Sequence, residues 1–276
     1  MYIHIKQKMM KKTTIFTLVG AIALTFTACK NAPDSDEAKT GDAKEVSITE
    51  GAATVAINTT DSKVEWIGTK LSAYHSGTVN IKSGDLQLKD GVIAGGKFVM
   101  DMPTLISLKD DATTNGKLTG HLLSPDFFDV AKFPESTFEI TGVKPFTGAT
   151  ATGGDQAEIS EYTVADPNFM VSGNLKIKDV TKNIEFPAKI TVNNNGVDAV
   201  AKFNIDRKLW NIVYPGMPDD LIQDMIWFGI SLKASAAEPT ALKEKQSSGC
   251  FSNAGSVNFP ALLFIVAQTF ISARLF

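Results

Sequence analysis

Residues that could carry out acid–base chemistry are few and widely spaced in this sequence. After the first ten residues the histidines are His75 and His121, and no H-E-x-x-H, G-x-S-x-G, G-x-G-x-x-G or Walker motif occurs. A Ser-His-Asp triad is defined by geometry, so the sequence leaves open one built from distant residues. The histidines and carboxylates also lack the spacing of a metal site. We therefore expect a protein that is not an enzyme and that holds no metal and no cofactor.

Cys29 is suited to a different chemistry, the attachment of a lipid. Lys11 and Lys12 precede an apolar stretch at residues 15–26, and small residues stand directly before the cysteine. This pattern resembles a bacterial lipoprotein signal, although Phe26 occupies the usual leucine position. We expect a signal peptide at 1–28 and a periplasm-facing protein of the bacterial cell envelope, lipid-anchored to a membrane through Cys29. The alternative is a plain signal peptide with an incidental cysteine.

Composition restricts the remaining function classes. The formal net charge is −3 and no dense Lys/Arg block occurs, which argues against binding of nucleic acid. Hydrophobic residues at 43% are enough for a globular core. Residues 29–52 are polar and acidic, so we expect a flexible lipidated tether there. The tail at 235–276 has three open interpretations: a read-through extension, a weak membrane-associating helix, or an extra packing element.

The elements that must position any site are β-strands. Between residues 53 and 234, apolar and polar residues alternate in short runs separated by turn residues, which is typical of an all-β domain. We expect Phe98, Met100 and Met102 to share one face, as do Phe138 and Ile140. Turns are predicted at Ser83-Gly84-Asp85, Asp90-Gly91 and Asn193-Asn194-Asn195-Gly196.

Three segments interrupt the alternation. Asn115–Leu123 and Met217–Asp224 are predicted as short helices, and Gly148–Ser160 as a mobile loop. About eight strands with one apolar face each must close on themselves or form a sandwich, and closure also removes exposed edges. We expect an eight-stranded antiparallel barrel with one or two short helices.

Several segments resemble the YceI-like family. They are Trp66-Ile67-Gly68, His75-Ser76-Gly77, His121-Leu122-Leu123-Ser124-Pro125-Asp126-Phe127-Phe128-Asp129-Val130, Phe133-Pro134-Glu135-Ser136-Thr137-Phe138, the run from Gly173 to Lys182, and Arg207-Lys208-Leu209-Trp210. The match runs from Thr59 to Ala234 in the family's order. Asp179 and Leu209-Trp210-Asn211 depart from the usual Gly and Trp-Gly, which should alter a turn and a strand end. The resemblance implies a lipocalin-like barrel that binds a polyisoprenoid chain.

An eight-stranded barrel is wide enough for one slender ligand. We expect an isoprenoid-like lipid, another long apolar lipid or a quinone inside it, and a role as a membrane-tethered carrier or reservoir. A lipid head group needs a donor at the barrel mouth, for which His75, His121 and Arg207 are candidates. The full set of lumen and mouth candidates is Trp66, His75, Phe98, Met100, His121, Phe127, Phe128, Phe138, Phe203, Arg207 and Trp210. The alternative is a structural or partner-binding envelope module filled by its own side chains, and a homodimer stays open.

Overall fold

The structure, a computed structural model, describes residues 32–47, 49–148, 161–193 and 196–235. All of these belong to one compact unit, 1–238, and the second unit, 239–276, lies outside the described residues. The expected signal peptide, Cys29, nearly all of the 235–276 tail and the 149–160 part of the expected loop also lie outside them.

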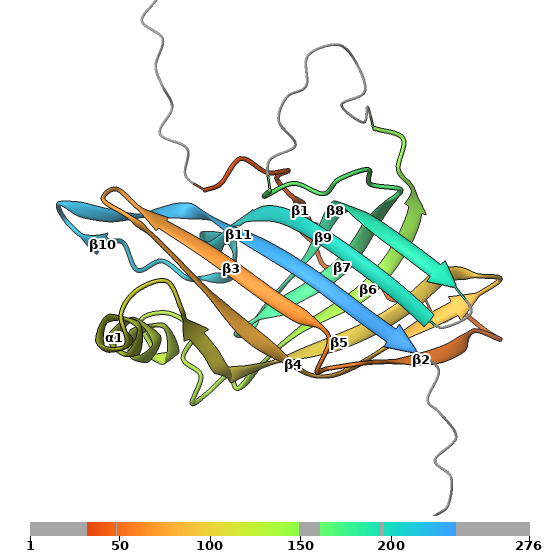
Figure 1. The fold of residues 1–276 in the computed structure, drawn as a ribbon, viewed down its shortest axis with the longest axis horizontal. Coiled ribbons are helices and arrows are strands. Elements are labelled where there is room, and N and C mark those ends of the chain that lie inside the picture. Colours follow the sequence, from red (N-terminus) through yellow and green to blue (C-terminus); the bar gives the residue numbers. More distant parts are fainter. Residues whose placement is uncertain (1–31, 48, 149–160, 194–195, 236–276) are drawn as a thin grey trace, which may run out of the picture. The chain divides into compact units, whose positions relative to one another are not determined.

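The fold is an eight-stranded closed antiparallel β-barrel, as predicted (Figure 1). Successive strands pair with their neighbours, and the last strand closes the barrel on the first. The barrel strands are β3 (Lys63–Lys70), β4 (Tyr74–Lys89), β5 (Val92–Ser107), β6 (Glu135–Pro145), β7 (Phe169–Ile177), β8 (Val180–Asn193), β9 (Gly196–Asp206) and β11 (Asp220–Ser235). The short β2 (Ala53–Ile57) pairs with β4 and β11 beyond the start of β3.

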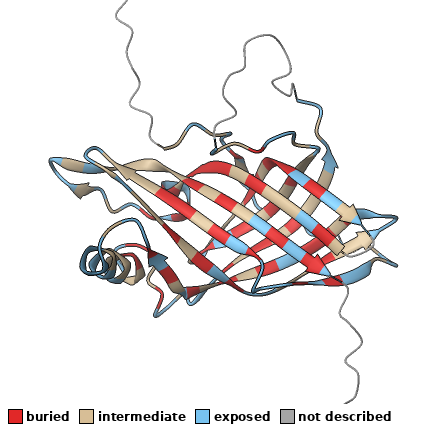
Figure 2. Ribbon diagram, in the orientation of Figure 1, coloured by how far each residue is buried: buried red, intermediate tan, exposed pale blue. Residues whose placement is uncertain are grey.

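Alternating burial along the strands produces the core (Figure 2). Phe98, Met100 and Met102 are all buried on β5, and Phe138 and Ile140 on β6, as the period of two predicts. The barrel interior is therefore made by the apolar faces that the sequence indicated.

Two of the three predicted turns are confirmed. Asp90 and Gly91 have φ of 52° and 77° and join the paired residues Lys89 and Val92. Asn193 likewise pairs with Gly196 across a two-residue connection. The first is a tight hairpin of the expected kind, and the two residues between Asn193 and Gly196 lie outside the described residues.

The turn predicted at Ser83-Gly84-Asp85 is wrong, because β4 runs through it. The register against β5 shifts between Ile81 and Ser83, which marks a bulge in a continuous strand. A Cβ atom at Gly84 would lie 2.7 Å from Phe98 Cβ, so glycine here permits close packing of two strands.

The first predicted helix is confirmed and the second is wrong. α1 (Ala112–Leu123) is capped by Asp111, whose carboxylate accepts from the backbone N–H groups of Thr113 and Thr114. Residues 217–224 instead belong to a hairpin in which a two-residue turn joins β10 (Gly216–Met217) to the start of β11. Pro218 follows β10 at the start of the turn, a position that suits its fixed φ as well as a first helical turn does.

The expectation of a flexible tether is wrong for residues 33–44. β8 and β9 pair with each other only between Ala188–Asn193 and Gly196–Ala201. Beyond that point β1 (Lys39–Asp42) pairs with β8, and Asp36 and Ala38 form backbone hydrogen bonds with Asn204 of β9. Residues 33–44, which we call the seam segment, therefore bridge the gap between β8 and β9 through backbone hydrogen bonds. Composition does not reveal this contribution, because it comes from the backbone.

Asn174 fastens the end of this seam segment. Its Nδ2 donates to the Lys44 carbonyl at 2.7 Å, and its Oδ1 accepts from the Lys44 N–H at 3.0 Å. We expect Asn174→Ala to speed hydrogen exchange of the β1 amides about thirtyfold, since each of the two lost bonds contributes about 1 kcal/mol. Lys44→Ala keeps both backbone bonds and is the control; equal exchange in the two variants would contradict the assignment.

Candidate ligand-binding cavity

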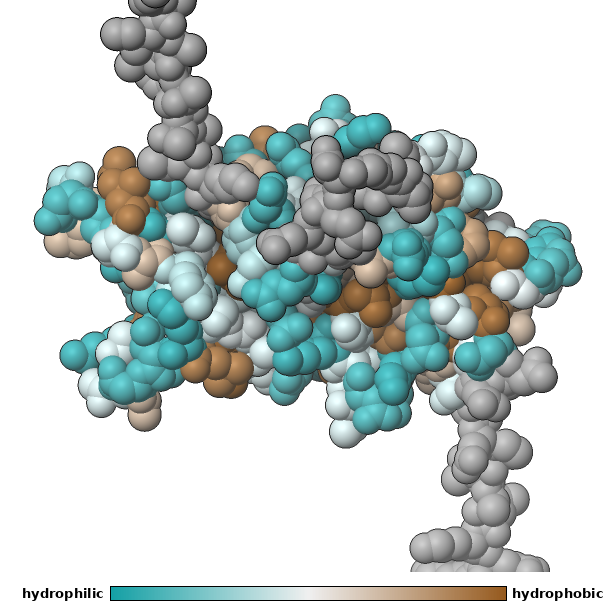
Figure 3. All heavy atoms as spheres, turned by 45° about the horizontal axis from the view of Figure 1, so that its top comes forward, coloured by the Kyte–Doolittle hydropathy of each residue, from teal (hydrophilic) through white to brown (hydrophobic). Residues whose placement is uncertain are grey.

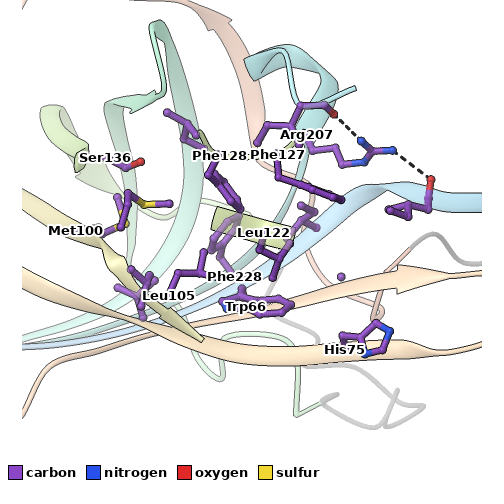
Figure 4. Close-up of a pocket in the computed structure, with 18 of the residues that line it drawn as sticks. Trp66, His75, Met100, Leu105, Leu122, Phe127, Phe128, Ser136, Arg207 and Phe228 are labelled. Carbon is purple, nitrogen blue, oxygen red and sulfur yellow. Dashed lines mark hydrogen bonds between the residues drawn. The ribbon is translucent and has the colours of Figure 1, made fainter. Parts of the chain in front are cut away.

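A cavity of about 360 Å³ occupies the end of the barrel at which α1, the β3–β4 turn and the β10–β11 hairpin meet. Its wall is almost wholly apolar and includes side chains from most of the barrel strands and from α1 (Figure 4). The cavity reaches the surface where its lining residues are partly or largely exposed. These are Thr69, Lys70, Met217 and Asp220, which we call its mouth. Its size lies within the usual range for small-ligand pockets, about 300–1,000 Å³.

Most residues named from the sequence line this cavity. They are Trp66, His75, Phe98, Met100, His121, Phe127, Phe128, Phe138, Phe203 and Arg207. Trp210 does not line it: its side chain is completely buried, and its Nε1 donates to the Leu175 carbonyl at 3.0 Å. Trp210 fastens the 3₁₀ helix η1 (Arg207–Trp210) to β7, and Asn211 ends that helix at a φ of 57°, which asparagine tolerates.

Arg207 lines the cavity, but its guanidinium donates hydrogen bonds to backbone carbonyl groups. Only 1% of the residue is exposed, and its nitrogens donate to the carbonyls of Ile212, Ile222 and Gln223 at 2.5, 3.3 and 3.0 Å (dashed lines in Figure 4 mark bonds of this group). Burial lowers the pKa of the guanidinium, and the nearby Asp224 carboxylate opposes this shift. Arg207 thus joins η1 to the start of β11, and its proposed role as a head-group donor at the mouth is not supported by this geometry.

The two histidines are each held by a carboxylate. His75 Nδ1 lies 2.9 Å from Asp110 Oδ2, and His121 Nε2 lies 3.0 Å from Asp126 Oδ2. The His121 ring also makes edge-on contacts with Phe127 and Tyr214 at centroid distances of 4.9 and 4.8 Å. These contacts fix the ring orientations at the cavity wall, His75 on β4 and His121 on α1.

One completely buried side-chain nitrogen in the wall has no hydrogen-bond partner among the described residues. It is the indole nitrogen Nε1 of Trp66, on β3. The indole packs against Gly77, where a Cβ atom would lie 2.6 Å from the ring. An unpaired buried N–H is unusual in a folded protein, so this nitrogen is a donor that the protein itself leaves unused.

Sequence reasoning missed the part of the wall contributed by residues 212–230. Tyr214, Met217, Ile222 and Phe228 belong to this group. The expected helix over 217–224 covers Met217 and Ile222, which the structure places on β10 and β11. Residues on a hairpin of this kind are found only by extending the period-two pattern through the turn.

Asp220 connects the two turns at the mouth. Its carboxylate lies 2.5 Å from Lys70 Nζ and accepts from the Ser72 backbone N–H and hydroxyl at 3.0 and 2.9 Å. The hydrogen bond from Lys70, followed by those from Ser72, lowers the pKa of Asp220 below its ordinary value of 3.8.

This shift predicts an acid-sensitive mouth. A carboxyl group with a lowered folded-state pKa contributes its stability above the unfolded pKa, and the contribution disappears as the pH falls through the folded value. Protection of the Leu71 amide, which donates to the Leu221 carbonyl, should therefore decrease below about pH 3.8. Asp220→Asn should show the reduced protection at pH 6 as well, measured by hydrogen exchange. A variant that keeps full protection at pH 6 would contradict the link.

The described residues contain no group of three or more His, Cys, Asp or Glu side chains placed to hold a metal ion. Within the same part of the chain, no helix has the length and apolar character needed to cross a membrane.

Comparison with known proteins identifies the domain. The model of the YceI-like domain matches residues 55–234. Among solved structures, the chain is similar to BcnA of Burkholderia cenocepacia at 17% identity and a TM-score of 0.47, covering 65% of this chain and 99% of the other. It is also similar to a polyisoprenoid-binding domain from Saccharophagus degradans implicated in plant cell wall breakdown, at 11% identity, a TM-score of 0.46 and coverage of 66% and 98%. The YCEI protein of Campylobacter jejuni is 16% identical, with a TM-score of 0.39 and coverage of 72% and 92%.

No curated protein sequence matches the chain. The family model agrees with the motifs between Thr59 and Ala234 and spans almost the entire barrel. On this evidence the chain belongs to the YceI-like domain family.

Proposed function

We propose that this protein binds a long apolar lipid, of isoprenoid-like chemistry, inside its barrel and does not catalyse a reaction. The observation that carries the proposal is the apolar cavity of about 360 Å³, which opens at one end of the barrel. A prenyl chain or a quinone tail supplies the slender apolar group that such a cavity accepts. Each buried methylene contributes about 0.8 kcal/mol, so a few isoprene units bind without any polar contact.

The alternative interpretation, a structural or partner-binding barrel, requires an interior filled by the protein's own side chains. A contiguous cavity that reaches the surface is evidence against it. Catalysis is a weaker alternative still, because the cavity wall is almost wholly apolar and the sequence carries none of the enzyme motifs named above.

We also propose that the barrel works as a lipid-anchored carrier or reservoir in the bacterial cell envelope. The seam segment supports a close attachment, because Asn204 Nδ2 donates to the Pro33 carbonyl at 3.0 Å. Pro33 follows Cys29 by four residues, which span about 14 Å at most when extended. An acyl group on Cys29 would therefore hold the barrel near the membrane instead of on a long tether.

The direct test is to identify what the protein carries. The full chain is expressed with its own signal in a bacterial host, purified in mild detergent, extracted with organic solvent and examined by mass spectrometry. We expect an isoprenoid, a quinone or another long apolar lipid at about one molecule per barrel. Empty protein that also fails to take up farnesol or a prenyl quinone would contradict the proposed function.

Intact mass spectrometry of the same preparation tests the anchor. We expect a mature chain that begins at Cys29 and carries acyl groups. An unmodified cysteine would contradict the anchor and leave the lumen proposal standing.

A further inference from the structure

Large exposed hydrophobic side chains gather at the open end of the barrel. Six of them define what we call the mouth rim, with exposed fractions between 45% and 62%: Leu71, Tyr74, Leu108, Val213, Met217 and Leu221. Figure 3 shows a small group of hydrophobic residues on the surface at the end that carries the β3–β4 and β10–β11 turns, and further hydrophobic residues at the opposite end. Single exposed apolar residues are ordinary, but a group around one opening marks an interaction site.

Contacts between the turns bring four of these residues, Leu71, Tyr74, Leu108 and Leu221, close to one another. The Leu71 N–H donates to the Leu221 carbonyl at 3.2 Å, which places the two exposed leucines on adjoining turns. On the other side, the Leu108 N–H donates to the Ser76 carbonyl at 2.9 Å, close to the start of β4 at Tyr74.

The rim is continuous with the lumen. Met217 lines the cavity and is also 61% exposed, so the apolar surface of the interior extends onto the outside of the β10–β11 hairpin. Lys70 and Asp220 line the mouth and are paired with each other, so neither presents an unpaired charge there. An apolar chain that leaves the cavity passes directly over this surface.

We propose that the mouth rim docks on a lipid bilayer, so that the cavity opens onto the hydrocarbon region. This inference rests on the proposed lipid binding. Each methylene group that a lipid exposes to water on its way between membrane and barrel lowers the fraction of lipid in that exposed state about fourfold. A long chain therefore cannot move efficiently through solvent.

The chemistry of the rim favours a membrane over a second copy of the chain. Lys109 Nζ lies 3.9 Å from the centroid of the Tyr74 ring and donates to the Tyr74 carbonyl. A tyrosine with an adjacent lysine has an apolar body and a polar end, the combination that suits the interface between lipid tails and water. A second barrel seated on the rim would cover the mouth and trap the ligand.

The test compares two pairs of substitutions in the full chain carrying Cys29→Ser, so that no acyl anchor contributes. Leu71→Ser with Leu221→Ser removes two rim residues that do not line the cavity. Val46→Ser with Val92→Ser removes two residues away from the rim that are 39% and 45% exposed, and is the matched control. Each protein is mixed with vesicles of phosphatidylethanolamine and phosphatidylglycerol, and binding is measured by flotation.

We expect the rim pair to bind vesicles about tenfold more weakly and to take up dansyl-farnesol from them about tenfold more slowly, with the control pair unchanged. Uptake of dansyl-farnesol from cyclodextrin, which needs no membrane, should be the same in both.

Equal vesicle binding by both pairs would overturn the docking surface, as would a rim pair that changes only the self-association seen in sedimentation equilibrium. Failure of every protein to take up the probe from cyclodextrin would instead overturn the proposed function. If the rim pair does not fold by circular dichroism, Val213→Ser, at a position 62% exposed, replaces it.

Discussion

Arg207→Met is expected to lower the free energy of unfolding by about 3–5 kcal/mol. The guanidinium is buried and donates to the Ile212 carbonyl, which follows η1, and to the Ile222 and Gln223 carbonyls of β11. Methionine fills a similar length of space but donates nothing, and each buried acceptor left unpaired costs about 1–3 kcal/mol. Urea unfolding followed by tryptophan fluorescence measures the change.

Lys208→Met is the matched control for this prediction. Lys208 is the next residue, and its Nζ bonds Asp224 at 2.7 Å on the surface, with 49% of the side chain exposed. Loss of such a pair changes stability by less than about 1 kcal/mol. A stable Arg207→Met protein with weakened lipid affinity would restore Arg207 as a head-group donor and contradict the structural role.

Ser136→Phe is expected to weaken binding of a prenyl probe by about fiftyfold or more. Ser136 is buried on β6, lines the cavity and lies near Met100 in Figure 4. A phenyl ring there occupies space that the ligand needs, and exclusion of three methylenes costs about 2.4 kcal/mol. Because the ring enters an existing cavity, we expect no loss of stability.

Thr137→Phe separates this effect from a general disturbance of the strand. Thr137 is the next residue on β6, and the alternation of burial places it on the outer face. Fluorescence titration with dansyl-farnesol should give the unsubstituted affinity for Thr137→Phe and a much weaker one for Ser136→Phe. Equal affinities would show that the ligand does not occupy this cavity.

The features that were predicted from the sequence are those with local signals. The apolar faces at Phe98–Met102 and Phe138–Ile140 were predicted because side chains of a strand point alternately to opposite faces. The Asp90-Gly91 hairpin and the α1 helix were predicted because their signals also lie within a few residues of the chain. Ten of the eleven candidate residues line the cavity. Strand periodicity indicated the inward side chains on the strands, and the family motifs indicated His121, Phe127, Phe128 and Arg207, which lie outside the strands.

The errors came from long-range contacts. Gly84 resembles a turn residue until the position of Phe98 on the neighbouring strand is known. Pro218 fits both a helix start and a hairpin, and pairing of Met217 with Asp220 selects the hairpin. Local signals of this kind are ambiguous, and the choice depends on the strands that pack around them.

The amino-acid sequence by itself determined the all-β class, the inward faces of the strands and the family, because these follow from side-chain alternation and local motifs. The tertiary structure alone decided that residues 33–44 close the seam between β8 and β9, and that Arg207 donates to backbone carbonyls instead of facing the mouth. Backbone hydrogen bonds of the seam segment leave no mark on composition, because every residue type except proline carries the same donor and acceptor. The direction of a long side chain likewise depends on which acceptors the folded chain brings within its reach.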